Sequence, residues 1–335
     1  MSSATPIDGV DVVLADLDGV VYAGADAIPY AVESINALAE TRSVGYITNN
    51  AARTPASVAE HLSALGLAVG PDDVVTSPQA AVRLLAELIP ARSTVLVVGG
   101  DGLTSEVEKA GFSVTFSSDD KPAAVIQGFA PSVGWTQLAE ASFALQADIP
   151  WVATNTDWTI PQARGVAPGN GTLVSAVHTA VGRLPVVAGK PEIAIFDEAV
   201  RRFGAAKALF LGDRLDTDIL GANRAGIDSA LVLTGIDRAK QVLAADKNSR
   251  PTYILDDLRQ LWEPYPATEV STDPATGDRI VSVASSAVRL AGNVVSVERA
   301  GERSVDLLRA AASAIWGSGV AIYGLTVAPE LYSER

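Results

Sequence analysis

Near its N-terminus the chain reads Val12-Val13-Leu14-Ala15-Asp16-Leu17-Asp18-Gly19-Val20. The four apolar residues predict a buried β-strand, and two carboxylates follow that strand directly. Burying like charges is costly unless a cation or hydrogen-bond donors compensate them. A solvated turn is the alternative, whereas a calcium loop of the EF type is excluded because the sequence does not continue as D-x-D-x-D-G. We therefore interpret Asp16 and Asp18 as the start of a ligand site.

Short apolar runs alternate with segments of helical periodicity over roughly the first 260 residues. This alternation predicts an α/β fold with a parallel sheet that is covered on both faces. Strands are expected at residues 12–15, 44–48 and 208–211, and helices at residues 30–41 and 191–203. Ligands of such sheets bind at the carboxyl ends of the strands, so the chemistry is expected there.

The composition limits the partners that the chain can bind. Apolar residues make up 48% of the sequence and charged residues 19%, which excludes general disorder. With 25 basic and 39 acidic residues the net charge is −14, so we expect neither nucleic acid nor a membrane surface as a partner. The N-terminus lacks the features of a signal peptide and no apolar run approaches the length of a membrane span, so we expect a cytoplasmic location.

The chain contains no cysteine, and its two histidines are His61 and His178. Disulfides, cysteine nucleophiles, iron-sulfur clusters and cysteine-based zinc sites are therefore excluded. Both histidines lie in segments that predict helices, and neither a G-x-S-x-G nor an H-E-x-x-H motif occurs. The chemistry left to the chain uses carboxylate, lysine and hydroxyl groups.

Three further motifs lie at the ends of predicted strands or the starts of helices. Thr48-Asn49-Asn50 ends the second strand and offers a hydroxyl group and amides. Gly189-Lys190-Pro191 places a lysine at a helix start, where a cation is unfavourable unless an anion is also bound. This lysine is not part of a P-loop, because Pro191 replaces the Ser or Thr of that motif. Gly212-Asp213-Arg214-Leu215-Asp216-Thr217-Asp218 adds carboxylates after another apolar strand.

The character of the sequence changes after Trp262. Residues 263–277 are rich in Pro and Thr, show no periodicity and predict a linker. Beyond them, apolar runs on both sides of Gly292-Asn293 predict a hairpin, Ser304 opens a predicted helix, and residues 320–323 are expected to form a closing strand. Residues 278–335 are thus expected to form a small α+β unit, either an interaction module or a stabilising appendage.

Taken together, the four motifs resemble those of the haloacid dehalogenase superfamily of phosphohydrolases, over about residues 8–262. The insertion between Asn50 and Lys190 resembles the type-two cap of the branch that contains 4-nitrophenyl, phosphoglycolate and glycerol-3-phosphate phosphatases. The resemblance implies an α/β architecture with a Rossmann-like parallel-sheet core, residues 1–77 and 186–262, and an inserted α/β cap domain, residues 78–185. The linker, residues 263–277, and the small α+β C-terminal unit, residues 278–335, complete the expected architecture.

The resemblance also implies roles for the motif residues. Asp16 would attack phosphorus and form an aspartyl-phosphate, while Asp18 would act as general acid and base. Mg²⁺ would be held by Asp16, by Asp18 through its backbone carbonyl, and by Asp213, with Asp218 ordering a water ligand or the lysine. The residues expected to bind the phosphate oxygens are Thr48, Asn49 through its backbone, Asn50 and Lys190.

Substrate choice is expected to lie in the cap. Asn155, Asp157 and Arg164 are the candidates for contacts with the leaving group, and solvated cap loops are the alternative. A closing cap favours a small phosphorylated metabolite, with glycerol 3-phosphate the expected substrate. Phosphoglycolate, pyridoxal phosphate and nucleotides are alternatives, as is a phosphomutase that transfers the phosphoryl group to another hydroxyl. An alternative from another functional class is a catalytically idle metal-binding regulatory protein. The sequence also leaves open whether the chain forms a homo-oligomer.

Overall fold

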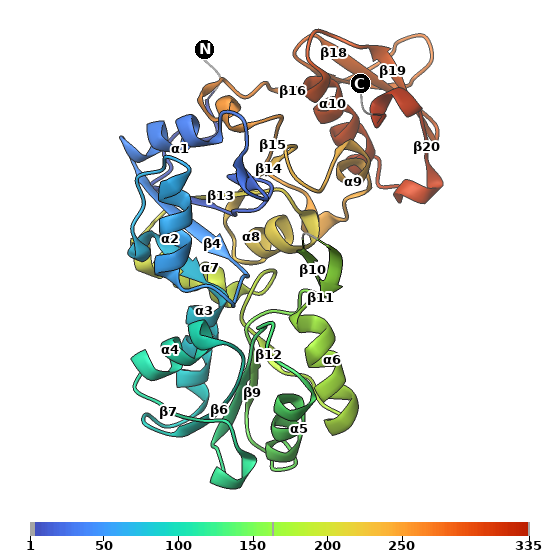
Figure 1. Ribbon diagram of the computed structural model, residues 1–335. Coiled ribbons are helices and arrows are strands. Elements are labelled where there is room, and N and C mark those ends of the chain that lie inside the picture. Colours follow the sequence, from blue (N-terminus) through green and yellow to red (C-terminus); the bar gives the residue numbers. More distant parts are fainter. Residues whose placement is uncertain (1–3, 163, 334–335) are drawn as a thin grey trace. The chain divides into compact units, whose positions relative to one another are not determined.

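The fold is described from a computed structural model, which covers residues 4–162 and 164–333 (Figure 1). The chain divides into two compact units. Unit 1 comprises residues 1–44 and 206–335, and unit 2 comprises residues 45–205. Each unit contains a parallel sheet with helices, so the α/β class expected from the sequence is confirmed.

Four parallel strands form the sheet of unit 1, in the order β15-β14-β13-β1. Both β1 (Val12–Ala15) and β13 (Ala208–Gly212) are fully buried and pair directly, as their uninterrupted apolar sequences predict. The outer strands are β14 (Asp228–Val232) and β15 (Tyr253–Leu255). Helix α8 (Leu220–Arg224) connects β13 to β14, α9 (Ala239–Ala244) lies between β14 and β15, and α1 (Ala31–Ala39) follows β1.

The segment after β13 does not form a single regular α-helix. A π-helical turn, η3 (Leu215–Ile219), comes first and continues into α8. The backbone amides of Asp218 and Ile219 both donate to the carbonyl of Arg214, at 3.1 Å each. This wider turn keeps Asp218 buried beside the end of β13, where its side chain accepts hydrogen bonds from the loop.

The C-terminal part of unit 1 is a five-stranded sheet with one long helix. Its strands lie in the order β16-β17-β18-β19-β20, and α10 (Ser304–Trp316) packs on β17 and β18. The hairpin at Gly292-Asn293 is confirmed, because Ala291 pairs with Val294. The remaining strand bounds are Arg279–Val283 for β17, Ser286–Ala291 for β18 and Val294–Arg299 for β19.

Two expectations for this part were wrong. The segment expected to be a linker contains β16 (Thr268–Thr272), which pairs with β17 although all its side chains are exposed. Backbone hydrogen bonds hold this edge strand, so its sequence carries no apolar alternation. The closing strand expected at residues 320–323 is replaced by a 3₁₀ turn at Ile322–Gly324, and β20 (Thr326–Val327) pairs with β19 instead.

Unit 2 contains a five-stranded parallel sheet in the order β12-β9-β8-β6-β7. Strand β4 (Ser43–Thr48), which begins in unit 1, pairs in parallel with β5 (Val74–Thr76), and both belong to the same six-stranded sheet as β1. The sheet strands are β6 (Thr94–Val98), β7 (Ser113–Thr115), β8 (Ala124–Gln127), β9 (Trp151–Ala153) and β12 (Val186–Val187). The helices are α2 (Pro55–Ala64), α3 (Ser77–Leu88), α4 (Asp101–Lys109), α5 (Trp135–Ala144), α6 (Asn170–Val181) and α7 (Ile193–Phe203).

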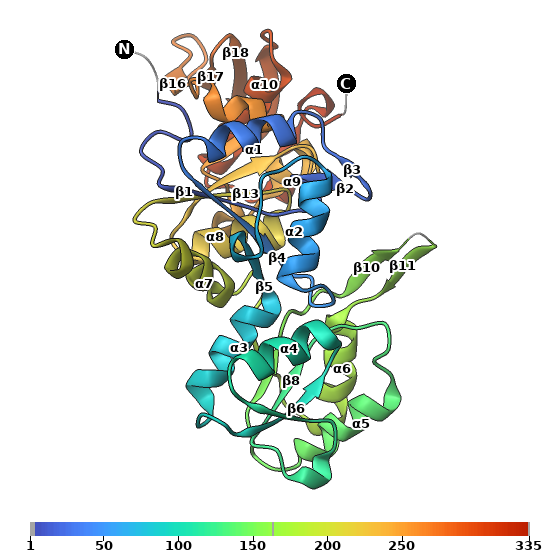
Figure 2. The same cartoon turned by 60° about the vertical axis from the view of Figure 1, so that its left-hand side comes forward.

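A hairpin that the sequence analysis did not anticipate connects the loop after β9 to α6. It consists of β10 (Thr159–Gln162) and β11 (Gly165–Pro168), and it extends from the rest of unit 2 (Figure 2). Its side chains alternate too little in polarity to reveal strands, and pairing within the hairpin supplies the backbone hydrogen bonds. In the described part of the chain, none of the helices has the length and apolar character needed to span a bilayer.

Candidate active site

Three buried carboxylates converge in unit 1 at the carboxyl end of the sheet. Asp16 follows β1 and Asp213 follows β13, and these strands are neighbours with Ala15 opposite Leu211. The backbone amide of Asp16 donates to the carbonyl of Leu211 at 2.8 Å, which extends this pairing by one residue. Asp16, Asp213 and Asp218 each offer an oxygen atom within 4.8 Å of the others. The arrangement predicted from strand ends therefore exists for these three residues.

The Asp213 side chain occupies a space that two glycines leave open. Its Oδ2 accepts a hydrogen bond from the backbone amide of Ile236 at 2.7 Å. A Cβ atom at Gly235 or at Gly19 would overlap the Asp213 carboxylate, and Gly19 also has a φ of +83°. The Thr234 hydroxyl donates to the carbonyl of Gly19 at 2.7 Å. Glycine at these two positions thus allows the loops after β1 and β14 to hold the carboxylate in one place.

Asp218 is fully buried and anchors the loop that carries Asp213. One of its oxygens accepts hydrogen bonds from the backbone amides of Asp213 and Arg214, both at 3.2 Å. By contrast, Asp216 is exposed and forms an ion pair with Arg214 at 2.8 Å. Two acids that lie two residues apart in the sequence therefore have different environments, because the π-helical turn directs Asp218 into the interior.

The sequence analysis missed Asp237, which lies beside this loop. Its Oδ2 accepts a hydrogen bond from the amide of Leu215 at 2.6 Å, and its own amide donates to the carbonyl of Asp213 at 3.1 Å. Burial raises the pKa of Asp237 above its ordinary value, although the hydrogen bond from Leu215 opposes the rise. The available signal was its position in the polar segment after β14, at the same edge of the sheet as Asp16.

The side chain of Asp18 does not belong to the carboxylate group. It is exposed, and the Tyr22 hydroxyl lies 3.5 Å from its Oδ2. The amide of Gly19 donates to the carbonyl of Tyr22 at 2.8 Å, which closes the turn after Asp18. An exposed carboxylate at this place suits proton exchange with a substrate, and the metal contact expected from its backbone carbonyl stays a prediction.

The carboxylate group suits a hard divalent cation. Three buried like charges within a few ångströms of one another are unfavourable unless a cation compensates them. Carboxylate oxygens are the ligands that Mg²⁺ prefers, whereas zinc sites are typically built with His or Cys. No cysteine occurs in the sequence, and the three residues of this group are all aspartates. The donor set therefore fits Mg²⁺.

In unit 2, Asn49 links two of the predicted motifs. Its side-chain amide donates to the carbonyl of Lys190 at 3.1 Å, and its Oδ1 accepts from the amide of Lys190 at 2.8 Å. This reciprocal pair fixes the backbone of Lys190, whose side chain is buried. The hydroxyl oxygen of Thr48 accepts from the amide of Asn50 at 3.1 Å, so it shapes the turn after β4. Thr48, Asn49 and Lys190 are thus brought into one cluster, with Asn50 exposed beside it.

The loop after β9 contacts this cluster through two of the predicted cap residues. Asp157 accepts a hydrogen bond from the Asn49 side chain at 3.1 Å. Asn155 is buried, donates to the Asn49 carbonyl at 2.7 Å and accepts from the Asp157 amide at 3.2 Å. The Asn170 amide group in turn donates to the Asn155 carbonyl at 2.7 Å. Both ends of the Asn155 side-chain amide are hydrogen-bonded to protein atoms, so this side chain holds the loop after β9 in place.

The third cap residue, Arg164, lies apart from these two. It is exposed and belongs to the turn between β10 and β11. The base of that hairpin is the pair Thr159 and Pro168, while the tip follows the pair Gln162 and Gly165. With about 3.3 Å per residue, the strand alone separates the tip from the base by about 10 Å. Arg164 therefore stays a predicted substrate contact without a place in the cluster around Asn49.

Comparison with known proteins agrees with this geometry. Residues 13–113 match the family described as haloacid dehalogenase-like hydrolase, and residues 187–261 match one described as HAD-hydrolase-like. The chain is 41% identical over 310 residues to the D-glycerol 3-phosphate phosphatase of Mycobacterium tuberculosis, covering 91% of this chain and 86% of that protein.

Solved structures show the same likeness. The crystal structure of the glycerol phosphate phosphatase of M. tuberculosis with magnesium superposes with a TM-score of 0.85 at 39% identity, covering 97% of this chain and 95% of that one. A p-nitrophenyl phosphatase from Archaeoglobus fulgidus gives a TM-score of 0.70 at 28% identity, covering 75% and 98%.

Proposed function

The chain belongs to the haloacid dehalogenase-like hydrolase family, and we propose that it hydrolyses D-glycerol 3-phosphate to glycerol and inorganic phosphate. The observation that carries the reaction class is the group of three buried carboxylates, Asp16, Asp213 and Asp218, at adjacent strand ends. The substrate is supported by the 41% identity to a D-glycerol 3-phosphate phosphatase over 91% of the chain.

In the proposed reaction Asp16 attacks phosphorus in line, and the bond from phosphorus to the ester oxygen breaks. Asp18 gives its proton to the departing glycerol oxygen, and Asp16 then carries the phosphoryl group as an aspartyl-phosphate. Asp18, now ionised, takes a proton from a water molecule that attacks the aspartyl-phosphate and releases inorganic phosphate. The exposed position of the Asp18 side chain leaves it accessible to the alcohol and the water between which the proton must pass.

Mg²⁺ would be held by Asp16 and Asp213, with the backbone carbonyl of Asp18, and would supply positive charge to the phosphoryl oxygens during transfer. Asp218 would hold the loop that carries Asp213 in place, and the two hydrogen bonds that it accepts from this loop support that role. We further propose that Thr48, the Asn49 and Asn50 segment and the Lys190 ammonium bind the remaining phosphate oxygens.

The reaction mechanism is tested with Asp16→Asn in the presence of Mg²⁺. Phosphate release from D-glycerol 3-phosphate should fall below detection, because uncatalysed hydrolysis of phosphate monoesters is slower than the enzymatic reaction by many orders of magnitude. Asp216→Asn is the matched control, since that aspartate is exposed and paired with Arg214. It should keep its turnover. Residual turnover of a few per cent in Asp16→Asn would contradict the aspartyl-phosphate mechanism.

The substrate is tested by a phosphate-release screen over glycerol phosphate, phosphoglycolate, pyridoxal phosphate, nucleotides and sugar phosphates. A kcat/KM for D-glycerol 3-phosphate at least tenfold above every other compound is the expected result. Asp157→Ala and Arg164→Ala are then compared on glycerol phosphate and 4-nitrophenyl phosphate. A selective loss on glycerol phosphate identifies a contact with the leaving group, whereas equal losses on both compounds remove that residue from the specificity argument. Turnover also decides against the idle regulatory protein.

Further proposals concern the location of the enzyme, the acceptor of the phosphoryl group and the domain boundaries. We propose that it acts in the cytoplasm, because its expected substrate is a small phosphorylated metabolite. Release of inorganic phosphate with water as the sole acceptor distinguishes hydrolysis from phosphoryl transfer to another hydroxyl. The domain boundaries at residues 77/78, 185/186 and 262/263 also stay predictions, and limited proteolysis of the full chain tests them.

A further inference from the structure

We propose that unit 1 carries a second ligand site, which binds a small organic oxyanion beside the C-terminal end of α10. The site is a cavity of about 400 Å³. Three arginines line it, and no aspartate or glutamate lies among its lining residues in the part of the chain that the structure describes. In a chain with a net charge of −14, such a surface is unusual. The side chains used below are Arg250, Arg279, Arg309, Trp316 and Tyr265.

Two of the arginines lie close together without a carboxylate partner. Arg250 donates to the carbonyl of Trp316 at 3.4 Å, and Arg279 donates to the carbonyl of Gly317 at 2.6 Å. Because these acceptors belong to consecutive residues, the two guanidinium groups are neighbours. Within residues 4–162 and 164–333, neither of them forms an ion pair. Two like charges repel each other at such a place, so an anion between them is favourable.

Two residues of the cavity wall each carry a buried hydrogen-bond donor that no protein group accepts. The Nε atom of Arg279 and the indole Nε1 of Trp316 are both inaccessible to solvent and have no acceptor among the described residues. Buried donors are normally satisfied, and a pair of them beside one cavity indicates a missing acceptor. An oxyanion has several lone pairs and can accept from these donors once the two side chains turn toward it, in addition to the other guanidinium N–H groups.

Stabilisation of the helix end accounts for only part of this arrangement. Cations near the last carbonyls of a helix interact favourably with its dipole, and Arg250 and Arg279 both lie at the end of α10. That role uses a single hydrogen bond to α10 from each guanidinium, and Arg250 donates one more, from Nε to the carbonyl of Ala245 at 3.4 Å, whereas each group has five N–H donors. The third arginine, Arg309, adds no net charge, because it is paired with Asp306 at 2.7 Å.

The cavity walls indicate the kind of molecule that fits. The Trp316 ring lies 5.3 Å from the guanidinium carbon of Arg250, and the Tyr265 ring lies 4.4 Å from that of Arg309. The ligand is therefore a phosphate or carboxylate with an apolar or planar remainder. None of the lining residues belongs to the carboxylate group around Asp16, so the site binds a ligand without hydrolysing it. A second cavity nearby is lined by residues of both charges, including Glu263, Glu302 and Arg303, and lacks this preference.

The experiment is isothermal titration calorimetry on the full-length protein in excess chelator, with inorganic phosphate and citrate as separate probes. Removing Mg²⁺ weakens any binding of phosphate at the catalytic carboxylates, so that binding at the second site is measured. At least one probe should bind with a Kd below about 10 mM. Arg279→Gln and Arg250→Gln should each weaken that binding at least tenfold, because each removes one charge-assisted contact.

Arg299→Gln is the matched control, since Arg299 also donates to a backbone carbonyl, that of Ser285, and does not line the cavity. It should bind the probe as the unchanged protein does. Thermal unfolding in the absence of anions shows whether each variant is folded, and Trp316→Phe provides a variant that keeps all the charges. Tighter binding of phosphate than of citrate identifies a phosphorylated ligand, and the reverse identifies a carboxylate. Failure of both probes to bind, or equal binding by the two arginine variants and the unchanged protein, overturns the proposal.

Discussion

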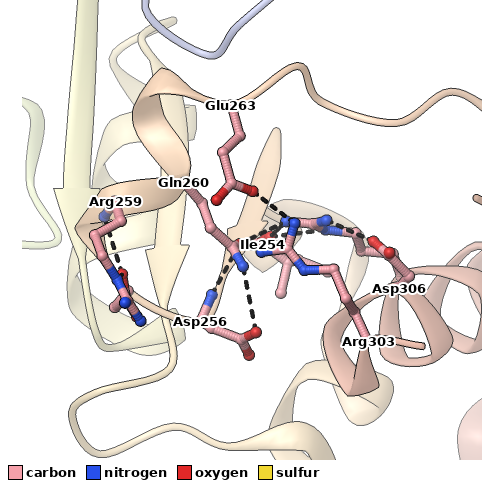
Figure 3. Close-up of polar contacts among 9 residues, drawn as sticks. Ile254, Asp256, Arg259, Gln260, Glu263, Arg303 and Asp306 are labelled. Carbon is pink, nitrogen blue, oxygen red and sulfur yellow. Dashed lines mark hydrogen bonds and ion pairs between the residues drawn. The ribbon is translucent and has the colours of Figure 1, made fainter.

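The buried Arg309 of α10, which donates hydrogen bonds to a carbonyl of the parallel sheet, gives a stability prediction. Arg309 is buried, forms an ion pair with buried Asp306 at 2.7 Å, and donates to the carbonyl of Ile254 at 2.5 and 2.9 Å and to Gln260 at 2.9 Å. Figure 3 labels these three partners, Ile254, Gln260 and Asp306. Arg309→Met keeps most of the side-chain volume but leaves the Asp306 carboxylate and the Ile254 carbonyl without their partner. Stranding a buried charge in this way costs about 3–5 kcal/mol of unfolding free energy.

The measurement is urea unfolding followed by tryptophan fluorescence, in which Trp262 and Trp316 report on this unit. With a slope of about 3 kcal/mol per molar urea, the midpoint should fall by about 1–2 M. Adding Asp306→Asn to Arg309→Met should recover about 1–3 kcal/mol, since it removes the stranded charge.

The control for this pair is Arg259→Met. Arg259 forms an ion pair with Asp257 at 2.7 Å, but 55% of its side chain is exposed. Exposed pairs contribute about 1 kcal/mol or less, so this variant should lose little stability. If Arg309→Met lost no more stability than Arg259→Met, the Arg309 side chain would not hold α10 on the sheet, and the reasoning from burial would be refuted.

Two further predictions concern a glycine and a carboxylate. Gly235→Ala should raise the Mg²⁺ concentration for half-maximal activity by about 10–100-fold, because the added methyl group displaces Asp213, and an unchanged requirement would contradict the assigned ligand. Burial opposes ionisation of Glu198, but hydrogen bonds from Arg201 and Arg202 outweigh it and hold the pKa of Glu198 below its ordinary value. The contribution of Glu198 to stability is therefore complete above about pH 4.5, the ordinary pKa of a glutamate, and is lost as the pH falls through the lowered pKa of the folded state. In the unchanged protein the urea midpoint should decline between about pH 5 and 3, and Glu198→Gln should make this decline shallower.

Much of the architecture could be predicted because buried parallel strands leave a clear signal. The strand expected at residues 12–15 matches β1, and the helix expected at residues 191–203 matches α7 to within two residues. Exposed edge strands and two-stranded hairpins were missed, as β16 and β10 show. Their stability comes from backbone pairing, which leaves little pattern in the side chains.

The carboxylate group could be predicted for a similar reason. Asp16 and Asp213 follow neighbouring strands, so the topology alone brings them together. The contribution of Asp237 and the contacts of Asn155 could not be predicted, because both depend on how loops separated by many residues meet. The sequence of a loop has no periodic pattern, so it does not reveal whether a residue such as Arg164 lies at the base or the tip of a hairpin.

The apolar cluster beneath α10 ties the carboxylate group to the C-terminal sheet. Leu215 and Ile219, which flank Asp218 in the π-helical turn, share this cluster with Leu308 and Ile315 of α10. The turn and the helix should therefore open together, as one cooperative unit in hydrogen exchange. A protease cut after residue 262 would then not release an independently folded C-terminal part. Substitutions in α10, although they lie far from the reacting atoms, would reduce catalytic activity in a genetic screen.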